Sequence, residues 1–272
     1  RGFTDETVRV VIDGVCVNNA QYGTYDFSAI NLNDIEKIEI VRGGFTEGVT
    51  DEGAVGGVIY ITTKKQQLGT NYSFDSKIKT FFNKNHPVDF LSENINFSSQ
   101  IGDNSFFKTN NAFSFANNKF LYKNYNSEIT ERRNSEVMDV HSDINFTSYF
   151  GNGSSFSFSN IFYLGNKNLP GTATSVNYDK QKDYDNMLSV SLNVPSLANG
   201  IKFFTDASWL CNNRFVDEGI SPLAENVSSH SRHYVNTLRY SAILDADNFS
   251  KVNESVGLTF DYTFLDSTED GK

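Results

Sequence analysis

The stretch GGVIYITTKKQQLGTNYSFDSKIKTFF, residues 56–82, contains the point at which the character of the chain changes. Up to about Lys64 the sequence is compact and punctuated by glycine, and residues 58–63 form a β-branched run that predicts a strand. From Tyr72 onward, short runs of alternating apolar and small polar residues repeat along the chain. A small unit followed by many two-faced strands predicts an outer-membrane barrel with a domain inside it.

Composition limits the class of protein. The 272 residues carry a net charge of −10, and 38% are hydrophobic. No apolar run reaches the roughly 18 residues of a membrane helix, but strands that meet lipid on one face need no such run. The acidic balance argues against a nucleic-acid partner, because phosphate binding needs clustered Lys and Arg. We expect the basic pairs Lys64-Lys65 and Arg132-Arg133 to be solvated turn residues.

The period-two pattern predicts nine antiparallel strands over residues 72–266, with apolar faces outward and Ser, Asn, Thr and Asp facing a wet lumen. In the first strand Tyr72, Phe74, Ile78 and Phe82 share the apolar face. The nine apolar faces begin at Tyr72, Leu91, Phe107, Val140, Phe156, Leu188, Ile201, Tyr234 and Val256.

The breaks between these strands alternate in length. The short breaks are residues 102–104, 151–153, 196–200 and 245–250, and the long ones are residues 83–89, 123–136, 165–181 and 212–229. Short turns on one rim and long loops on the other are typical of outer-membrane barrels. A soluble sandwich also alternates, but strands of about ten residues or more with sorted loops favour the barrel.

The first unit shows its own strand and turn signals. Residues 8–13 predict a strand that turns at Asp13-Gly14, and residues 18–25 predict a polar loop. Asn33-Asp34 is expected to cap a short helical turn before a strand over residues 35–42. Gly56-Gly57 lacks the spacing of a phosphate loop and predicts a close approach of strand and turn. The unit is too short to bury much core alone.

Four pieces of this unit occur in one order: Arg1-Gly2-Phe3, VVIDGV at 10–15, DIEKIEIVRG at 34–43 and AVGGVIYITTK at 54–64. In that order they resemble the C-terminal part of the plug domain of TonB-dependent outer-membrane receptors. Asn168-Leu169-Pro170-Gly171 resembles a short piece of the early barrel in that family. Cys16 and Gly44 stand where the family often has proline, and residues 45–53 lack its usual Leu-Tyr-Gly.

The resemblance implies an all-β, mainly antiparallel chain: a transmembrane β-barrel with an N-terminal α+β plug domain, both incomplete. Residues 1–65 would form the C-terminal part of the plug, and residues 66–272 the first nine strands of a 22-stranded barrel. The chain starts inside a motif and shows no signal peptide, so we expect it to be an internal piece of a longer protein.

The implied function is TonB-dependent active transport of a scarce solute, of the siderophore, cobalamin or oligosaccharide class, across a Gram-negative-type outer membrane. The expected partners are a TonB-type energy-coupling protein that binds an N-terminal box, an extracellular small-molecule or oligomeric ligand, and outer-membrane lipid. The alternative is a passive porin or adhesin barrel. A barrel enzyme would need a nucleophile with a base, and none can be placed, so no catalytic residue, cofactor or metal is expected.

The resemblance also implies site residues. Arg1 and Arg42 match arginines that pair with barrel-wall glutamates in the family and fasten plug to wall; the alternative is a pair of surface arginines. Two loops would face the ligand, although plain solvent loops fit equally well. Their residues are Phe3, Thr4, Asp5, Glu6, Asn18, Asn19, Tyr22 and Tyr25.

Other reactive side chains give weaker signals. Asp179, Asp183 and Asp185 are expected in a long loop, where calcium is conceivable but a solvated charged loop is preferred. None of the four histidines has metal-ligand spacing, and His230 and His233 are expected near a loop end in solvent. Cys16 and Cys211 are interpreted as isolated thiols rather than a disulfide.

Overall fold

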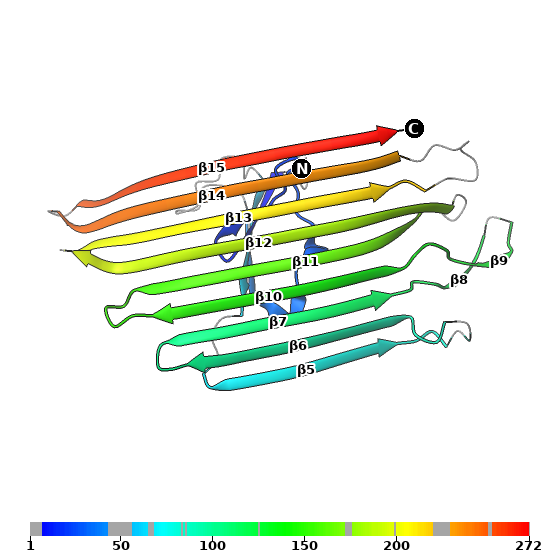
Figure 1. The fold of residues 1–272 in the computed structure, drawn as a ribbon, viewed down its shortest axis with the longest axis horizontal. Helices are drawn as coiled ribbons and strands as arrows, with labels where there is room; N and C mark the ends of the chain where they lie inside the picture. Colours follow the sequence, from blue (N-terminus) through cyan, green and yellow to red (C-terminus); the bar gives the residue numbers. More distant parts are fainter. Residues whose placement is uncertain are drawn as a thin grey trace.

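The computed structural model describes residues 7–42, 56–64, 68–82, 84, 86–124, 126–171, 176–198, 200–219, 229–249 and 252–271. It contains a four-stranded sheet, a nine-stranded sheet and a two-stranded hairpin. We call the four-stranded unit the plug and the nine-stranded sheet the wall. In Figure 1 the plug lies behind the broad face of the wall. None of the described helices is long and apolar enough to span a membrane.

The plug sheet has the order β2-β1-β4-β3. Its strands are β1 (Val8–Ile12), β2 (Val15–Cys16), β3 (Ile35–Val41) and β4 (Gly57–Thr63). β1 and β4 run parallel, and the other two pairs are antiparallel. The strands predicted at residues 8–13, 35–42 and 58–63 are therefore confirmed, with ends shifted by one residue.

Two sites with left-handed backbone, the Asp13-Gly14 turn and Gly57, explain the motifs of the plug. The predicted turn has left-handed backbone at Asp13 (φ 48°) and Gly14 (φ 90°). The Asp13 carboxylate accepts hydrogen bonds from the Thr63 backbone N–H (3.0 Å) and hydroxyl (2.5 Å), which joins this turn to the end of β4. At Gly57 (φ 122°), a Cβ atom would lie 2.5 Å from the carbonyl oxygen of Val41. The predicted close approach is confirmed there.

Two 3₁₀ turns connect β2 to β3. They are η2 (Phe27–Ala29) and η3 (Leu32–Asp34). The Asp26 carboxylate accepts from the backbone N–H of Ser28, and the Asn31 side chain accepts from the backbone N–H of Asn33. The predicted capping position at Asn33-Asp34 was therefore wrong by two residues, because Asn31 supplies the cap.

The wall contains the nine predicted strands, each antiparallel to its neighbours (Figure 1). They are β5 (Thr70–Lys79), β6 (Phe90–Ile101), β7 (Ser105–Ala116), β10 (Val137–Tyr149), β11 (Ser155–Gly171), β12 (Val176–Ala198), β13 (Ile201–Asp217), β14 (Ser229–Phe249) and β15 (Val252–Gly271). The hairpin of β8 (Leu121–Lys123) and β9 (Ile129–Glu131) lies in the break between β7 and β10.

Several predicted breaks are wrong, because strands continue through them. β11 and β12 cover most of residues 165–181, and β13 and β14 reach into residues 212–229 and 245–250. Strand pairing continues beyond the apolar band, where outward residues become polar and the alternation signal ends. The first strand was instead predicted to be too long, since Phe82 lies past the end of β5.

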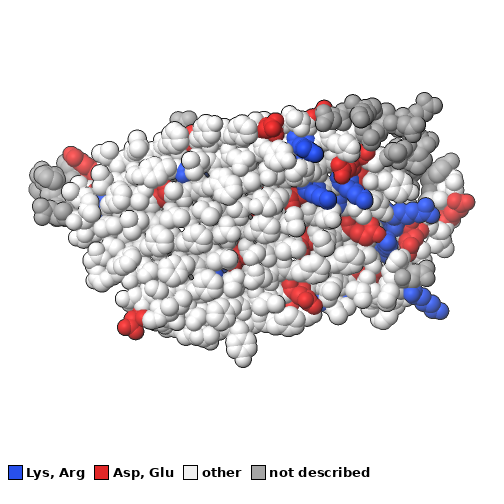
Figure 2. All heavy atoms as spheres, viewed as in Figure 1, with Lys and Arg blue, Asp and Glu red and all other residues white. Residues whose placement is uncertain are grey.

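The two faces of the wall follow the predicted alternation. Ile161, Met187 and Leu210 point to the plug. The residues directly before and after each of them in its strand therefore face away from the plug. Most of the outward face carries uncharged side chains (Figure 2). Polar residues interrupt it in lateral pairs, as where Asn160 Nδ2 donates to Asn186 Oδ1 at 2.9 Å.

The core lies between plug and wall rather than inside either. One apolar cluster combines buried residues of both. Its buried members are Val10, Ile12, Val15, Val17, Ile30, Ile61, Ile161, Met187 and Leu210. The predicted wet lumen is partly wrong here, because inward Asn94, Asn110 and Asp143 are buried. Cys16 and Cys211 are both buried free thiols, as the sequence indicated.

Candidate functional site at the plug–wall interface

The plug loop of residues 18–26, which we call the tip loop, is shaped by its own asparagines. Asn18 accepts from the backbone N–H of Val10 at 2.7 Å and donates to the carbonyl oxygens of Val8 and Gly23, each at 2.8 Å. Asn19 Oδ1 accepts from the backbone N–H groups of Gln21 (2.8 Å) and Tyr22 (3.2 Å). Both amides therefore fix the shape of the loop.

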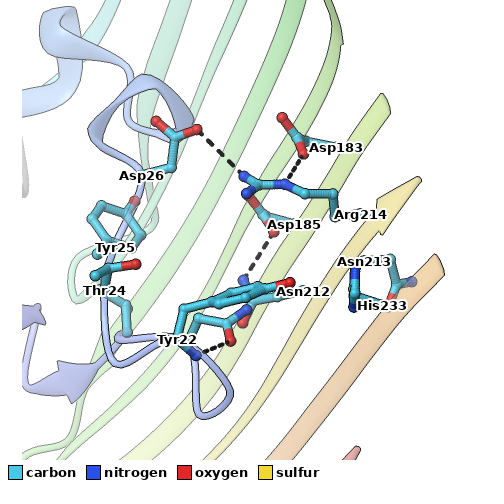
Figure 3. A pocket seen from close by; sticks show the side chains of 12 residues that line it. Tyr22, Thr24, Tyr25, Asp26, Asp183, Asp185, Asn212, Asn213, Arg214 and His233 are labelled. Carbon is cyan, nitrogen blue, oxygen red and sulfur yellow. Dashed lines mark hydrogen bonds and ion pairs between the residues drawn. The ribbon is translucent and has the colours of Figure 1, made fainter. Parts of the chain in front are cut away.

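The tip loop meets the wall through four charged residues of alternating sign, which we call the charged ring. Lys167 Nζ lies 3.2 Å from Asp26 Oδ2 and 3.2 Å from Asp183 Oδ2. Arg214 Nε lies 2.8 Å from Asp183 Oδ1, and its Nη2 lies 3.9 Å from Asp26 Oδ2 (Figure 3). Asp26 belongs to the plug, while β11, β12 and β13 supply the other three. The ring ties the plug to three neighbouring wall strands.

Further hydrogen bonds hold the ring. Asp183 is 3% exposed, and a buried carboxylate is costly unless it is paired. Gln181 Nε2 donates to both Asp183 oxygens, at 3.0 and 2.7 Å. Lys167 also donates to Ser28 Oγ at 3.0 Å. Burial opposes ionisation of Asp26, but hydrogen bonds from Ser28 and the Lys167 ammonium outweigh it, so the pKa of Asp26 lies below its ordinary value.

The two tyrosines of the tip loop have different surroundings. The Tyr22 ring is 39% exposed and meets the His233 ring edge-on at 5.9 Å. His233 also lies 3.4 Å from Gln21 Nε2. Tyr25 instead packs on the core cluster and on Phe27. Burial and nearby carboxylates raise the pKa of Tyr25, so its hydroxyl stays protonated. Tyr22, rather than Tyr25, therefore presents its ring to the space beside the tip loop.

Two hollows adjoin these residues. A cavity of about 60 Å³ lies between the tip loop and β12–β14, with room for about two water molecules. Its polar lining includes Asp185, which accepts from Asn212 Nδ2 at 2.9 Å (Figure 3). A more open hollow of about 640 Å³ is lined by residues 21–24 and Arg214. Its size is that of a small-molecule site.

A second plug–wall contact lies nearer the short-turn rim. The Lys108 ammonium, near the start of β7, contacts the Asp34 carboxylate and lies 2.5 Å from the Lys64 carbonyl oxygen. Beside it Asn31 Nδ2 donates to Asn94 Oδ1 at 3.3 Å. The charged ring lies toward the long-break ends of its strands, so the plug is fastened at two levels.

The structure describes only some of the residues that were predicted to fasten the plug to the wall or to face the ligand. Arg42 is exposed just after β3, an edge strand of the plug sheet. On that strand Ile38 is 53% exposed, and Lys37 pairs with Glu39 at 2.7 Å. Arg1, Phe3, Thr4, Asp5 and Glu6 lie outside the described residues.

Other sequence interpretations are corrected. Asp179, Asp183 and Asp185 lie on strand β12 rather than in a loop, and His233 lies on β14 beside the plug. Among the described residues, no group of three or more His, Cys, Asp or Glu side chains could hold a metal ion. Lys167 and Arg214 were not predicted as site residues from the sequence. The sequence did contain a signal for both residues. Alternation along their strands places them on the inner face, and a cation that faces the lumen needs a carboxylate partner.

Comparison with known proteins agrees with this architecture. Residues 1–58 match the family model of the TonB-dependent receptor plug domain. The vitamin B12 transporter BtuB of Vibrio cholerae serotype O1 is 41% identical over 75 residues, which are 27% of this chain and 12% of that protein. BtuB of Photobacterium profundum is 41% identical over 66 residues, 24% of this chain and 11% of that protein.

Two solved structures share the fold. The ferric yersiniabactin uptake receptor FyuA of Yersinia pestis superposes with a TM-score of 0.52 at 11% identity, covering 98% of this chain and 51% of that one. The ferric enterobactin receptor PfeA of Pseudomonas aeruginosa gives a TM-score of 0.52 at 13% identity, covering 100% of this chain and 53% of that one. The chain thus spans about half the length of these receptors.

A plug packed against a wall of long antiparallel strands defines a plugged outer-membrane barrel, and this chain contains part of each. Residues 1–58 thus match the plug domain of TonB-dependent receptors, and the chain shares its fold with about half of two receptors of this kind. The similar proteins are a vitamin B12 transporter and uptake receptors for ferric siderophores.

Proposed function

We propose that the complete protein is an active transporter, which captures a scarce solute outside the cell and releases it inward when a TonB-type protein moves the plug. The observation that carries this proposal is the shared core. Ile161, Met187 and Leu210 of the wall complete the apolar cluster of the plug. Moving the plug would expose this apolar surface to water, at a cost of about 25 cal/mol per Å². Such a cost favours coupling to an energy source over passive diffusion.

The proposed ligand site is the tip loop together with the hollow lined by residues 21–24 and Arg214. Tyr22 offers an amphipathic ring, and Arg214 offers planar donors. The lining fits a polar ligand that carries oxygen acceptors. Siderophores, cobalamin and oligosaccharides share this chemistry, and the proposal covers these three classes.

The proposed organisation extends beyond the chain. Residues 1–65 would be the C-terminal part of the plug, and residues 66–272 the first nine of 22 strands. A TonB-type protein would bind a box N-terminal to residue 1. We assign transport rather than catalysis, because the charged side chains of the site pair with one another across the plug–wall interface.

Uptake by the full-length receptor tests this proposal. Cells that express it would be given cyanocobalamin, ferric siderophores and oligosaccharides, with and without the TonB-type protein. We expect saturable uptake of one class, lost when the coupling protein is deleted while surface binding persists. Uptake that is linear in concentration and independent of the coupling protein would support the passive barrel instead.

A further inference from the structure

The outward face of the wall carries a cationic and aromatic cluster near the long-break ends of β12, β13 and β14. Strand register places Lys182 beside Phe215, and Phe215 beside Arg232. Tyr184 and Tyr234 occupy the adjacent row toward the short turns. We call these five residues the rim patch. Asp183 and Arg214 point to the plug, so Lys182 and Phe215 point away from it.

The aromatic rings of the rim patch are arranged in pairs. The Phe215 and Tyr234 rings meet edge-on at 5.4 Å, and Tyr184 meets Phe162 in the same manner at 5.3 Å. Figure 2 shows charged side chains gathered toward this end of the face, with an uncharged field beside them. Aromatic girdles mark the depth at which barrel strands leave the hydrocarbon for the headgroup layer.

The two cations of the patch, Lys182 and Arg232, are exposed and lack an ion-pair partner among the residues that the structure describes. Among the acids whose side chains the structure describes, the nearest on this face are Asp217, which pairs with His230 at 2.8 Å, and Asp266, which lies opposite Tyr234. Two exposed cations that pair with no described acid, at the edge of an apolar field, favour an anionic group at that depth.

We propose that the rim patch binds a phosphate-bearing lipid of the outer leaflet. Lys182 and Arg232 stand two strands apart, or about 10 Å between backbones, so both side chains can reach one phosphate. Arginine suits phosphate because its planar donors bind two oxygens at once. The acyl chains would lie on the row formed by Leu188, Trp209 and Leu238. This inference depends on the outer-membrane location and not on transport.

The test uses the full-length receptor in detergent, titrated with diphosphorylated lipid A and observed by native mass spectrometry. The double variant Lys182→Gln with Arg232→Gln should bind this lipid about 20-fold more weakly. This is because each of the two cations should raise the affinity for an anionic headgroup by a similar factor. The matched control, Lys123→Gln with Arg133→Gln, removes the same charge from exposed residues in the break between β7 and β10, and should bind normally. The charge-conserving swap Lys182→Arg with Arg232→Lys should also bind within a few-fold of the native receptor.

Three results would overturn the proposal. One is equal lipid binding by the double variant and the native receptor. Another is equal binding of lipid A from which both phosphates have been removed. The third is displacement of the lipid by millimolar inorganic phosphate, which would indicate a free-anion site rather than lipid docking. If the double Gln variant fails to fold, the single variants Lys182→Gln and Arg232→Gln decide, because lipid binding equal to that of the native receptor in both folded single variants would contradict the rim patch as the site.

Discussion

The Lys167 ammonium of the wall lies 3.2 Å from the Asp26 carboxylate of the plug, and the same nitrogen lies 3.2 Å from Asp183 of the wall. One cation therefore joins a carboxylate that would move with the plug to one that would remain in the wall. Arg214 completes this arrangement from the next strand. When Asp26 leaves, Lys167 and Arg214 keep Asp183 as a partner, so plug release strands no buried wall charge.

Asp26→Asn should loosen the plug while leaving the wall intact. The side chain of Asp26 is 39% exposed, so after discounting for solvent screening we expect a loss of only about 1 kcal/mol in plug docking. Limited proteolysis of the tip loop in the full-length receptor would measure it as faster cleavage. Asp103→Asn, in the exposed turn after β6, is the matched control and should leave cleavage unchanged. Equal cleavage of the native and Asp26→Asn receptors would argue against the charged ring as a plug tether.

The break between β7 and β10 should open in acid. Burial raises the pKa of Glu136, but hydrogen bonds from Lys119 (2.6 Å) and Asn168 (2.9 Å) outweigh it and lower this pKa to about 2. A lowered carboxyl pKa stabilises the folded state above the ordinary value of 4.5, and this stabilisation is lost as the pH falls from there toward about 2.

A spin label at Ser127→Cys, between β8 and β9, measures that opening as increased mobility. The transition should disappear in Glu136→Gln, in which the label should already be mobile at neutral pH. An identical acid transition in both proteins would mean that another group controls the segment.

The tip-loop tyrosines should separate ligand binding from stability. Tyr22→Ala should weaken ligand affinity about tenfold without changing thermal stability, because the Tyr22 ring is exposed beside the hollow. Tyr25→Ala should instead lower stability by about 2 kcal/mol, because its ring packs on the core. Calorimetry and ligand titration on the full-length receptor measure both. Unchanged ligand affinity in the double variant Tyr22→Ala with Tyr25→Ala would exclude the tip loop from the ligand site.

Arg42→Ala should reduce transport and leave surface binding largely intact. We predict that Arg42 and Arg1 pair with wall glutamates in the complete barrel, because an arginine inside a lumen needs carboxylate partners. Lys37→Ala on the same plug strand is the control, since Lys37 already pairs locally with Glu39. Normal uptake by the Arg42→Ala receptor would leave Arg42 as an ordinary surface arginine.

Much of the fold was predictable because strand alternation is a local signal. The alternation of Tyr72 and Phe74 with Ser73 and Asp75 is enough to assign the two faces of β5. Strand ends were not predictable from the same signal. Lys180 and Lys182 are outward residues beyond the apolar band, and a polar outward residue on a strand looks like a loop residue.

The contacts of the site were harder to predict, because they join distant segments. Alternation places Lys167, Asp183 and Arg214 on the inner face, but strand register alone does not say which plug residue meets them. Asp26 lies 141 residues from Lys167 in sequence, and no local pattern connects the two. The plug motifs indicated the fold of the plug, while the partners of its tip loop required the packed structure.

We propose that the plug must leave the wall at the charged ring for solute to pass. A receptor with Asp26→Cys and Lys167→Cys, with its native cysteines replaced by serine, can be joined by a short bis-methanethiosulfonate reagent. The measurement is ligand uptake by energised cells before cross-linking, after it, and after reduction. We expect cross-linking to abolish uptake while surface binding persists, and we expect reduction to restore uptake. Undiminished uptake through a fully cross-linked receptor would contradict this proposal.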